Sequence, residues 1–204
     1  MNLLAFFRRR QASASLEALA DFIDGNAAFL VQKGIYEYSR ARAGHYSKIL
    51  FAEDDFQQAV EHARWQAYPL GLAMVAEVAE GLLRAGDDDD RQRQLEALRA
   101  LVLSVFDRGP APAAIGEPAW AELRAALARR LQLIGLHPPK RAIDIPEQFV
   151  QSYFDLMPIH EKLRRAEFPT TRSYLRVTLC NIHDELSKRL NAQALVGMLC
   201  ARTG

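Results

Sequence analysis

Apolar residues recur along most of this chain with the spacing of an α-helix, at positions i, i+3, i+4 and i+7. Sustained alternation of apolar and polar residues, which is typical of a half-buried strand, is nearly absent. The pattern therefore predicts an all-α fold, in which about seven or eight helices form an irregular bundle around a long central helix near the N-terminus.

The first long helix is predicted from about Ser15 to Ala43. Its aliphatic residues fall on one face, and Gly44 is a typical residue to end it. Arg40 and Arg42 suit the last turn, because cations interact favourably with the negative end of the helix dipole. We expect this helix to be the centre of the bundle.

A second apolar stripe on the same helix is formed by Phe22, Phe29 and Tyr36, which are spaced seven residues apart. A helix that is apolar on two sides normally packs between two partners. We expect the stripe to be buried inside the molecule. The alternative is that Phe22 and Phe29 form an interface with a protein partner or with a second copy of the chain.

Prolines and glycines predict where the later helices begin and end. The second helix should run from Asp54 toward Arg84, with a kink or break near Tyr68 because Pro69 cannot donate a backbone hydrogen bond. The next helix should begin in the run of aspartates at 87–90, and further helices should follow. The last of these is expected after Pro169.

The same signals suggest how the chain is divided. We expect a flexible or amphipathic segment at 1–14, a main helical bundle at 15–108, a Pro/Gly/Ala linker at 109–118, and C-terminal helices at 119–204. The C-terminal helices could form a separate small domain, but packing on the same core is the expectation.

Charge and hydropathy argue against several classes of protein. With 26 basic and 25 acidic residues the chain has a net charge of +1, so nucleic acid is not the expected partner. No apolar run reaches the length of a transmembrane helix. If one helix carried both Cys180 and Cys200 they would lie about 30 Å apart, too far for a disulfide. Reduced cysteines favour a cytoplasmic protein.

Motifs for the common enzyme classes are absent from the sequence. There is no Gly-x-Ser-x-Gly elbow for a serine hydrolase, no glycine-rich phosphate loop, and no pair of histidines at metal-ligand spacing. Glu77 and Glu80 lie one helical turn apart, but Arg84 offers Glu80 a simple ion-pair partner. We therefore predict no catalytic residue, no metal and no cofactor, and we lean against an enzyme.

The densest polar and aromatic patch lies near the end of the first helix. Arginines interleaved with tyrosines can clamp an anion or stack on a ring. If the second helix folds back antiparallel, a histidine and a tryptophan could join the patch. The predicted ligand-binding residues are Tyr36, Tyr38, Arg40, Arg42, His45, His62 and Trp65. The alternative is an ordinary helix end with cations matched to its dipole.

Residues 1–10 combine four apolar side chains with three consecutive arginines. Such a segment can lie weakly on an anionic membrane surface. It can equally be a loose terminus or dock on the body of the protein.

Three segments carry a resemblance to known proteins: FLVQKGIYEYSRARAG at 29–44, LFAEDDF at 50–56 and ARWQA at 63–67. Over its first eighty or so residues the chain resembles a helical protein family of α-proteobacteria whose activity is not established. The resemblance implies a bacterial, cytoplasmic setting and transfers no functional residue.

These observations favour a non-enzymatic interaction or adaptor protein, which could be dimeric. The first alternative is a protein that binds a small molecule or an anion through the patch at 36–48. The second is a peripheral membrane protein that attaches through residues 1–10.

Overall fold

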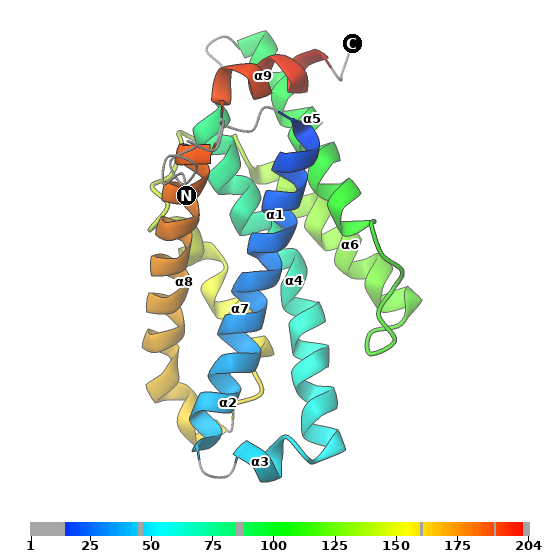
Figure 1. The fold of residues 1–204 in the computed structure, drawn as a ribbon, viewed down its shortest axis with the longest axis vertical. Coiled ribbons are helices and arrows are strands. Elements are labelled where there is room, and N and C mark those ends of the chain that lie inside the picture. The colour runs from blue at the N-terminus through cyan, green and yellow to red at the C-terminus, as the bar shows by residue number, and fades with distance from the viewer. Residues whose placement is uncertain (1–14, 45–46, 85–87, 160, 190, 202–204) are drawn as a thin grey trace, which may run out of the picture.

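The computed structural model describes residues 15–44, 47–84, 88–159, 161–189 and 191–201. All regular structure in these ranges is helical (Figure 1), which confirms the predicted all-α bundle. In chain order the elements are α1 (Leu16–Val31), a π-helical turn (Gln32–Glu37), α2 (Tyr38–Ala43), α3 (Ser47–Leu50), α4 (Asp54–Leu83), α5 (Asp88–Phe106), α6 (Glu117–Leu133), a 3-10 turn (Ile145–Gln148), α7 (Val150–Leu156), α8 (Glu161–Arg189) and α9 (Ala192–Ala201). The segment at 1–10, for which membrane contact is one of the alternatives, lies outside the described residues.

The N-terminal helical run has the ends that the sequence predicts. The hydroxyl of Ser15 accepts a hydrogen bond from the backbone N–H of Ala18 at 3.1 Å, so Ser15 is the N-cap of α1. The backbone then stays helical without a break through the π-helical turn to Ala43. Gly44 ends the run with φ at 51°, a conformation that glycine adopts without strain.

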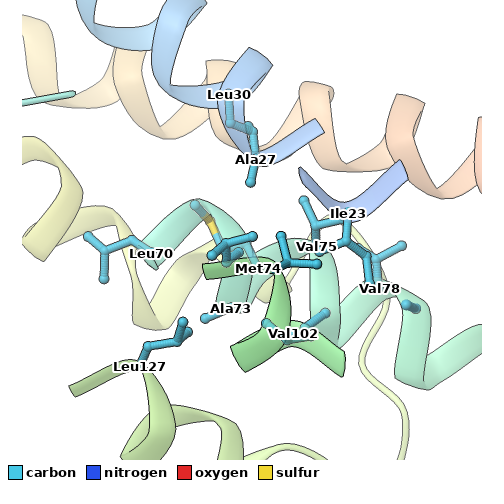
Figure 2. Packing of buried hydrophobic residues seen from close by; sticks show 14 of the residues in the cluster. Ile23, Ala27, Leu30, Leu70, Ala73, Met74, Val75, Val78, Val102 and Leu127 are labelled. Carbon is cyan, nitrogen blue, oxygen red and sulfur yellow. The ribbon is translucent and has the colours of Figure 1, made fainter. Parts of the chain in front are cut away.

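Helix α4 shares the centre of the bundle with α1. Every residue from 69 to 80 is buried, and α4 contacts α1, α5, α6, α7, α8 and α9. Figure 2 shows Ile23 and Ala27 of α1 above Met74 and Val75 of α4. The two helices are connected through α3 at one end of the bundle, so they run antiparallel (Figure 1).

The two central helices approach closely at one point. A Cβ atom added to Gly71 of α4 would lie 3.1 Å from the carbonyl oxygen of Ala27 and 3.3 Å from its Cα. Both distances are to backbone atoms, which cannot move aside as a flexible side chain can. The small residues Gly71 and Ala27 therefore allow the backbones of α1 and α4 to pack almost against each other.

Pro69 and Pro169 both lie inside helices and do not end them. Helix α4 runs without a break through the buried Pro69, so the break expected near Tyr68 is not found. Helix α8 begins at Glu161 rather than after Pro169, and a further helix, α9, follows it. Buried residues on both sides of each proline hold the helix in place, so tertiary packing outweighs the lost backbone hydrogen bond.

A π-helical turn interrupts the first helix just after α1. Such a turn contains one extra residue, which leaves a carbonyl without its usual helical donor. Here the carbonyl oxygen of Leu30 accepts hydrogen bonds from the hydroxyls of Tyr153 at 2.9 Å and Tyr174 at 3.0 Å. Gly34 makes room for them, because a Cβ there would lie 2.3 Å from the Tyr153 hydroxyl oxygen.

One cluster of buried apolar side chains extends from Leu19 to Leu199 and includes residues on both sides of the segment at 109–118. Helix α6 packs on α4 and α5, and α9 lies across one end of the bundle against α5, α4 and α1 (Figure 1). Cys180 and Cys200 are unbridged. Within the described ranges, no helix has the length and apolar character needed to cross a membrane.

The role of Gly34 can be tested with a single methyl group. We expect Gly34→Ala to lower the free energy of unfolding by about 1–3 kcal/mol, because the added Cβ collides with the Tyr153 hydroxyl. Gly25→Ala, in an exposed and open position of α1, is the matched control and should raise it by up to about 1 kcal/mol. Urea unfolding followed by circular dichroism measures both, and equal effects of the two substitutions would contradict this account.

Tyr153 should also make stability depend on alkaline pH. Burial raises the pKa of Tyr153 well above its usual value, and burial likewise raises the pKa of Tyr174. Below about pH 10 the folded and unfolded states both hold these protons. Above it only the unfolded chain ionises, so the free energy of unfolding falls as pH rises. In Tyr153→Phe this fall should be shallower by up to about 1.4 kcal/mol per pH unit, and identical slopes in urea unfolding above pH 10 would refute it.

Candidate functional site

A cavity of about 260 Å³ opens among α1, α4, α5 and α6. Four aromatic side chains form much of its wall: Trp65 and Tyr68 of α4, Phe106 of α5 and Trp120 of α6. The rings of Phe106 and Trp120 are stacked with centroids 4.1 Å apart, and Trp65 meets Trp120 edge-on at 6.0 Å. We call this space the aromatic cavity. Gly109 and Pro110, from the irregular segment before α6, line it as well.

Charged groups on one side of the aromatic cavity are held by hydrogen bonds. The Tyr68 hydroxyl donates to Asp24 Oδ1 at 2.7 Å, and Arg108 Nη1 donates to Asp24 Oδ2 at 3.2 Å. Arg108 also forms an ion pair with Asp21 at 2.9 Å. Burial, and then the hydrogen bond to Asp24, raise the pKa of Tyr68 far above its usual value. This hydroxyl therefore stays protonated and acts as a fixed donor.

A second cavity, of about 210 Å³, lies nearer the start of α4 and is lined by Tyr36, Phe51, Gln57, Val60, Glu61 and Arg64. The ring of Tyr36 packs edge-on against Phe51 with centroids 5.2 Å apart. Gln57 donates from its side-chain amide to the carbonyl of Phe51, which ties the start of α4 to the preceding loop. We call this space the polar cavity, because Gln57, Glu61 and Arg64 contribute to its wall.

Arg64 is shared by the two cavities, since its side chain lines both. Its guanidinium carbon lies 5.9 Å from the centroid of the Tyr36 ring, within the range of a cation–π interaction. Its Nε atom is buried and has no hydrogen-bond partner among the residues that the structure describes. A buried donor without an acceptor is costly and calls for an explanation.

The predicted ligand-binding residues lie in separate places. Tyr36 lines the polar cavity, and Trp65 lines the aromatic cavity. His62 is exposed and directs Nδ1 to the carbonyl oxygen of Ala114 at 2.9 Å, so it contacts the loop before α6. Tyr36, His62 and Trp65 therefore do not line one common cavity, although Arg64 of α4 lines both the polar and the aromatic cavity.

The remaining members of the predicted patch face α8 or solvent. The Tyr38 hydroxyl and Arg42 Nη2 both donate to the carboxylate of Glu167, whose side chain is 5% exposed. These contacts fix the end of the first helical run to α8. Arg40 is exposed, and His45 lies outside the described residues.

The predicted interface residues differ in exposure. Phe22 is partly buried and packs against the core, as the expectation of a buried stripe requires. Phe29 is 47% exposed, so burial of the whole stripe was a wrong expectation. The reason is that Phe29 lies about 100° around α1 from the buried Leu30, away from the face that packs into the core.

Glu77 and Glu80 are buried and form ion pairs. Glu80 pairs with Arg84 at 2.8 Å, which is the partner predicted from the sequence. Glu77 pairs with Lys140 at 2.7 Å and accepts a hydrogen bond from the Gln148 amide at 2.7 Å. Glu77 thus anchors the segment before α7 to the central helix.

Within the described ranges, no group of three or more His, Cys, Asp or Glu side chains could hold a metal ion. The aromatic cavity was missed at the sequence level, because its rings come from three helices and Phe106 and Trp120 carry the periodicity of ordinary core residues. The one signal in the sequence is that Trp65 and Tyr68 lie one helical turn apart on α4.

Comparisons with models of protein families, with curated proteins and with solved structures find no match to this chain.

Proposed function

We propose that this protein is a non-enzymatic binding protein that holds a small molecule with an apolar, ring-like body in the aromatic cavity. The observation that carries the proposal is the cavity itself, which offers about 260 Å³ beside four aromatic rings. Binding sites for small molecules are typically concave and mostly apolar, with a few polar groups that orient the ligand. Of the ligand-binding residues predicted from the sequence, Trp65 lines this cavity.

The polar groups beside the aromatic cavity are hydrogen-bonded to one another, which favours binding over catalysis. Asp24 accepts hydrogen bonds from both Tyr68 and Arg108, so its carboxylate is committed to holding the wall together. The raised pKa of Tyr68 opposes a role as a general base. These polar groups therefore shape the cavity and orient the ligand, while the aromatic rings supply contact area.

The size of the cavity suggests a probe. A cavity of about 150 Å³ lined by apolar side chains can hold benzene, so the aromatic cavity has room for a two-ring body. Naphthylacetamide, which is neutral, should bind with a dissociation constant of about 1 mM or lower. Both tryptophans of the chain line the cavity. Their indole N–H resonances in a proton–nitrogen correlation spectrum should therefore shift on titration.

A matched pair of variants locates the binding site. Ala28 lines the aromatic cavity from an exposed position of α1, so Ala28→Phe should fill it and weaken binding about tenfold or more, which corresponds to about 1.4 kcal/mol. Ala125→Phe, at an exposed position of α6 that is not in the cavity wall, should leave affinity unchanged. Unchanged indole resonances in the parent protein, or equal binding by the two variants, would refute the proposed site.

A second role, contact between two copies of the chain, is favoured by one observation. Phe29 presents a large apolar ring on α1 and is 47% exposed, and aromatic side chains are enriched in protein interfaces. Of the two interface residues predicted from the sequence, Phe29 is the one exposed for such a contact, whereas Phe22 packs against the core.

Sedimentation velocity tests the contact between copies. The parent protein should sediment as a dimer at high concentration, and Phe29→Ser should shift it to the monomer because the apolar contact is lost. Val177→Ser is the control, since Val177 is also exposed but lies on α8. If the parent protein is monomeric at every concentration, or if both variants dissociate equally, Phe29 is not the contact.

A further inference from the structure

Resting on the proposed function, we infer that the ligand of the aromatic cavity is an organic monoanion whose carboxylate pairs with Arg64. The apolar body of such a ligand occupies the aromatic cavity, and its charged end lies where Arg64 separates this cavity from the polar cavity. The inference assigns the chemical class of the ligand and the residue that selects it.

Arg64 lacks the ion-pair partner that nearby arginines have. Arg108, in the same cavity wall, pairs with Asp21 and Asp24, and Arg84, the residue after α4, pairs with Glu80. The Nε–H groups of Arg64 and Arg84 are both buried without an acceptor, but Arg64 also has no ion pair with any described residue. A carboxylate from a ligand would satisfy the Nε–H of Arg64 and neutralise its charge.

The guanidinium of Arg64 is held against an aromatic ring between the two cavities. It rests near the Tyr36 ring, 5.9 Å from the centroid, in the wall of both cavities. A planar guanidinium held against a ring has few rotamers left to lose when it binds, so its donors are partly pre-organised. A ligand in the aromatic cavity can therefore reach this charge without unfolding any part of the wall.

The carboxylates around Arg64 limit the charge of the ligand. Asp24 lines the aromatic cavity and Glu61 lines the polar cavity, so each side of Arg64 already carries one carboxylate. Arg108 is shared between Asp21 and Asp24, so of the two arginines in the cavity walls it is Arg64 that has no ion pair with a described residue. The carboxylates repel a dianion such as a phosphate monoester more strongly than a single carboxylate, so a monoanion is the favoured ligand.

The test compares two probes of nearly the same shape. Naphthylacetate carries a carboxylate, and naphthylacetamide replaces it with a neutral amide. At neutral pH the parent protein should bind the acetate about tenfold more tightly, because a charge-assisted hydrogen bond is stronger than a neutral one. The preference should shrink as salt concentration rises. Dissociation constants are obtained from the tryptophan indole resonances and from isothermal titration calorimetry.

Two variants assign the preference to Arg64. In Arg64→Gln the affinity for naphthylacetate should fall about tenfold while that for naphthylacetamide stays within about twofold, so that the preference is lost. Arg129→Gln, an exposed position on α6 outside both cavity walls, should retain the preference. Circular dichroism confirms that each variant is folded.

The outcomes separate this inference from the proposed function. If neither probe binds the parent protein, the proposed function itself fails. If both bind the parent protein with equal affinity, the cavity is a binding site but the ligand is not selected by charge, and the inference is overturned without any variant. It is also overturned if Arg64→Gln keeps the preference for the acetate, because another cation then binds the carboxylate.

Discussion

The architecture depends on the close approach of α1 and α4 at Ala27 and Gly71. With almost no side chain between them, the two helices lock along each other and the apolar faces on either side meet the surrounding helices. Residues one helical turn or less from this contact, Ala28 on α1 and Tyr68 on α4, line the aromatic cavity. The same contact that closes the core thus fixes two walls of the site, and α5 and α6 supply the others.

The π-helical turn sets the direction of the side chains that follow it along the first helical run. One extra residue rotates the following residues by about 100° relative to an uninterrupted α-helix. Tyr36 is thereby brought to Phe51 and Arg64, and Tyr38 to Glu167. The turn is stabilised from outside by two tyrosine hydroxyls on the Leu30 carbonyl. Since π-helical turns often occur next to functional sites, its place directly after Val31, a residue of the cavity wall, agrees with the proposed site.

Local features of the fold could be predicted from the sequence, whereas contacts between residues far apart in the chain could not. Helical periodicity and Gly44 correctly define the first helical run from Ser15 to Ala43. Pro69 and Pro169 misled the prediction, because packing on both sides of a proline is invisible in the sequence. The π-helical turn carries no pattern of its own, and its partner Tyr153 is more than a hundred residues away. Periodicity identified Phe106 and Trp120 as core residues but could not show that their rings meet Trp65.

A partly buried cation without a counter-ion lowers the stability of the empty protein, because its desolvation is not offset by a hydrogen bond or an ion pair. Arg64 therefore connects folding with binding. A ligand that supplies the missing acceptor binds the folded state and not the unfolded chain, so the stabilisation of the fold grows with the logarithm of one plus the ratio of ligand concentration to dissociation constant. The cation–π contact with Tyr36 compensates only in part. The polar groups around the aromatic cavity thus fall into two kinds: Asp24, Tyr68 and Arg108 satisfy one another and hold the wall, whereas Arg64 remains available to a ligand.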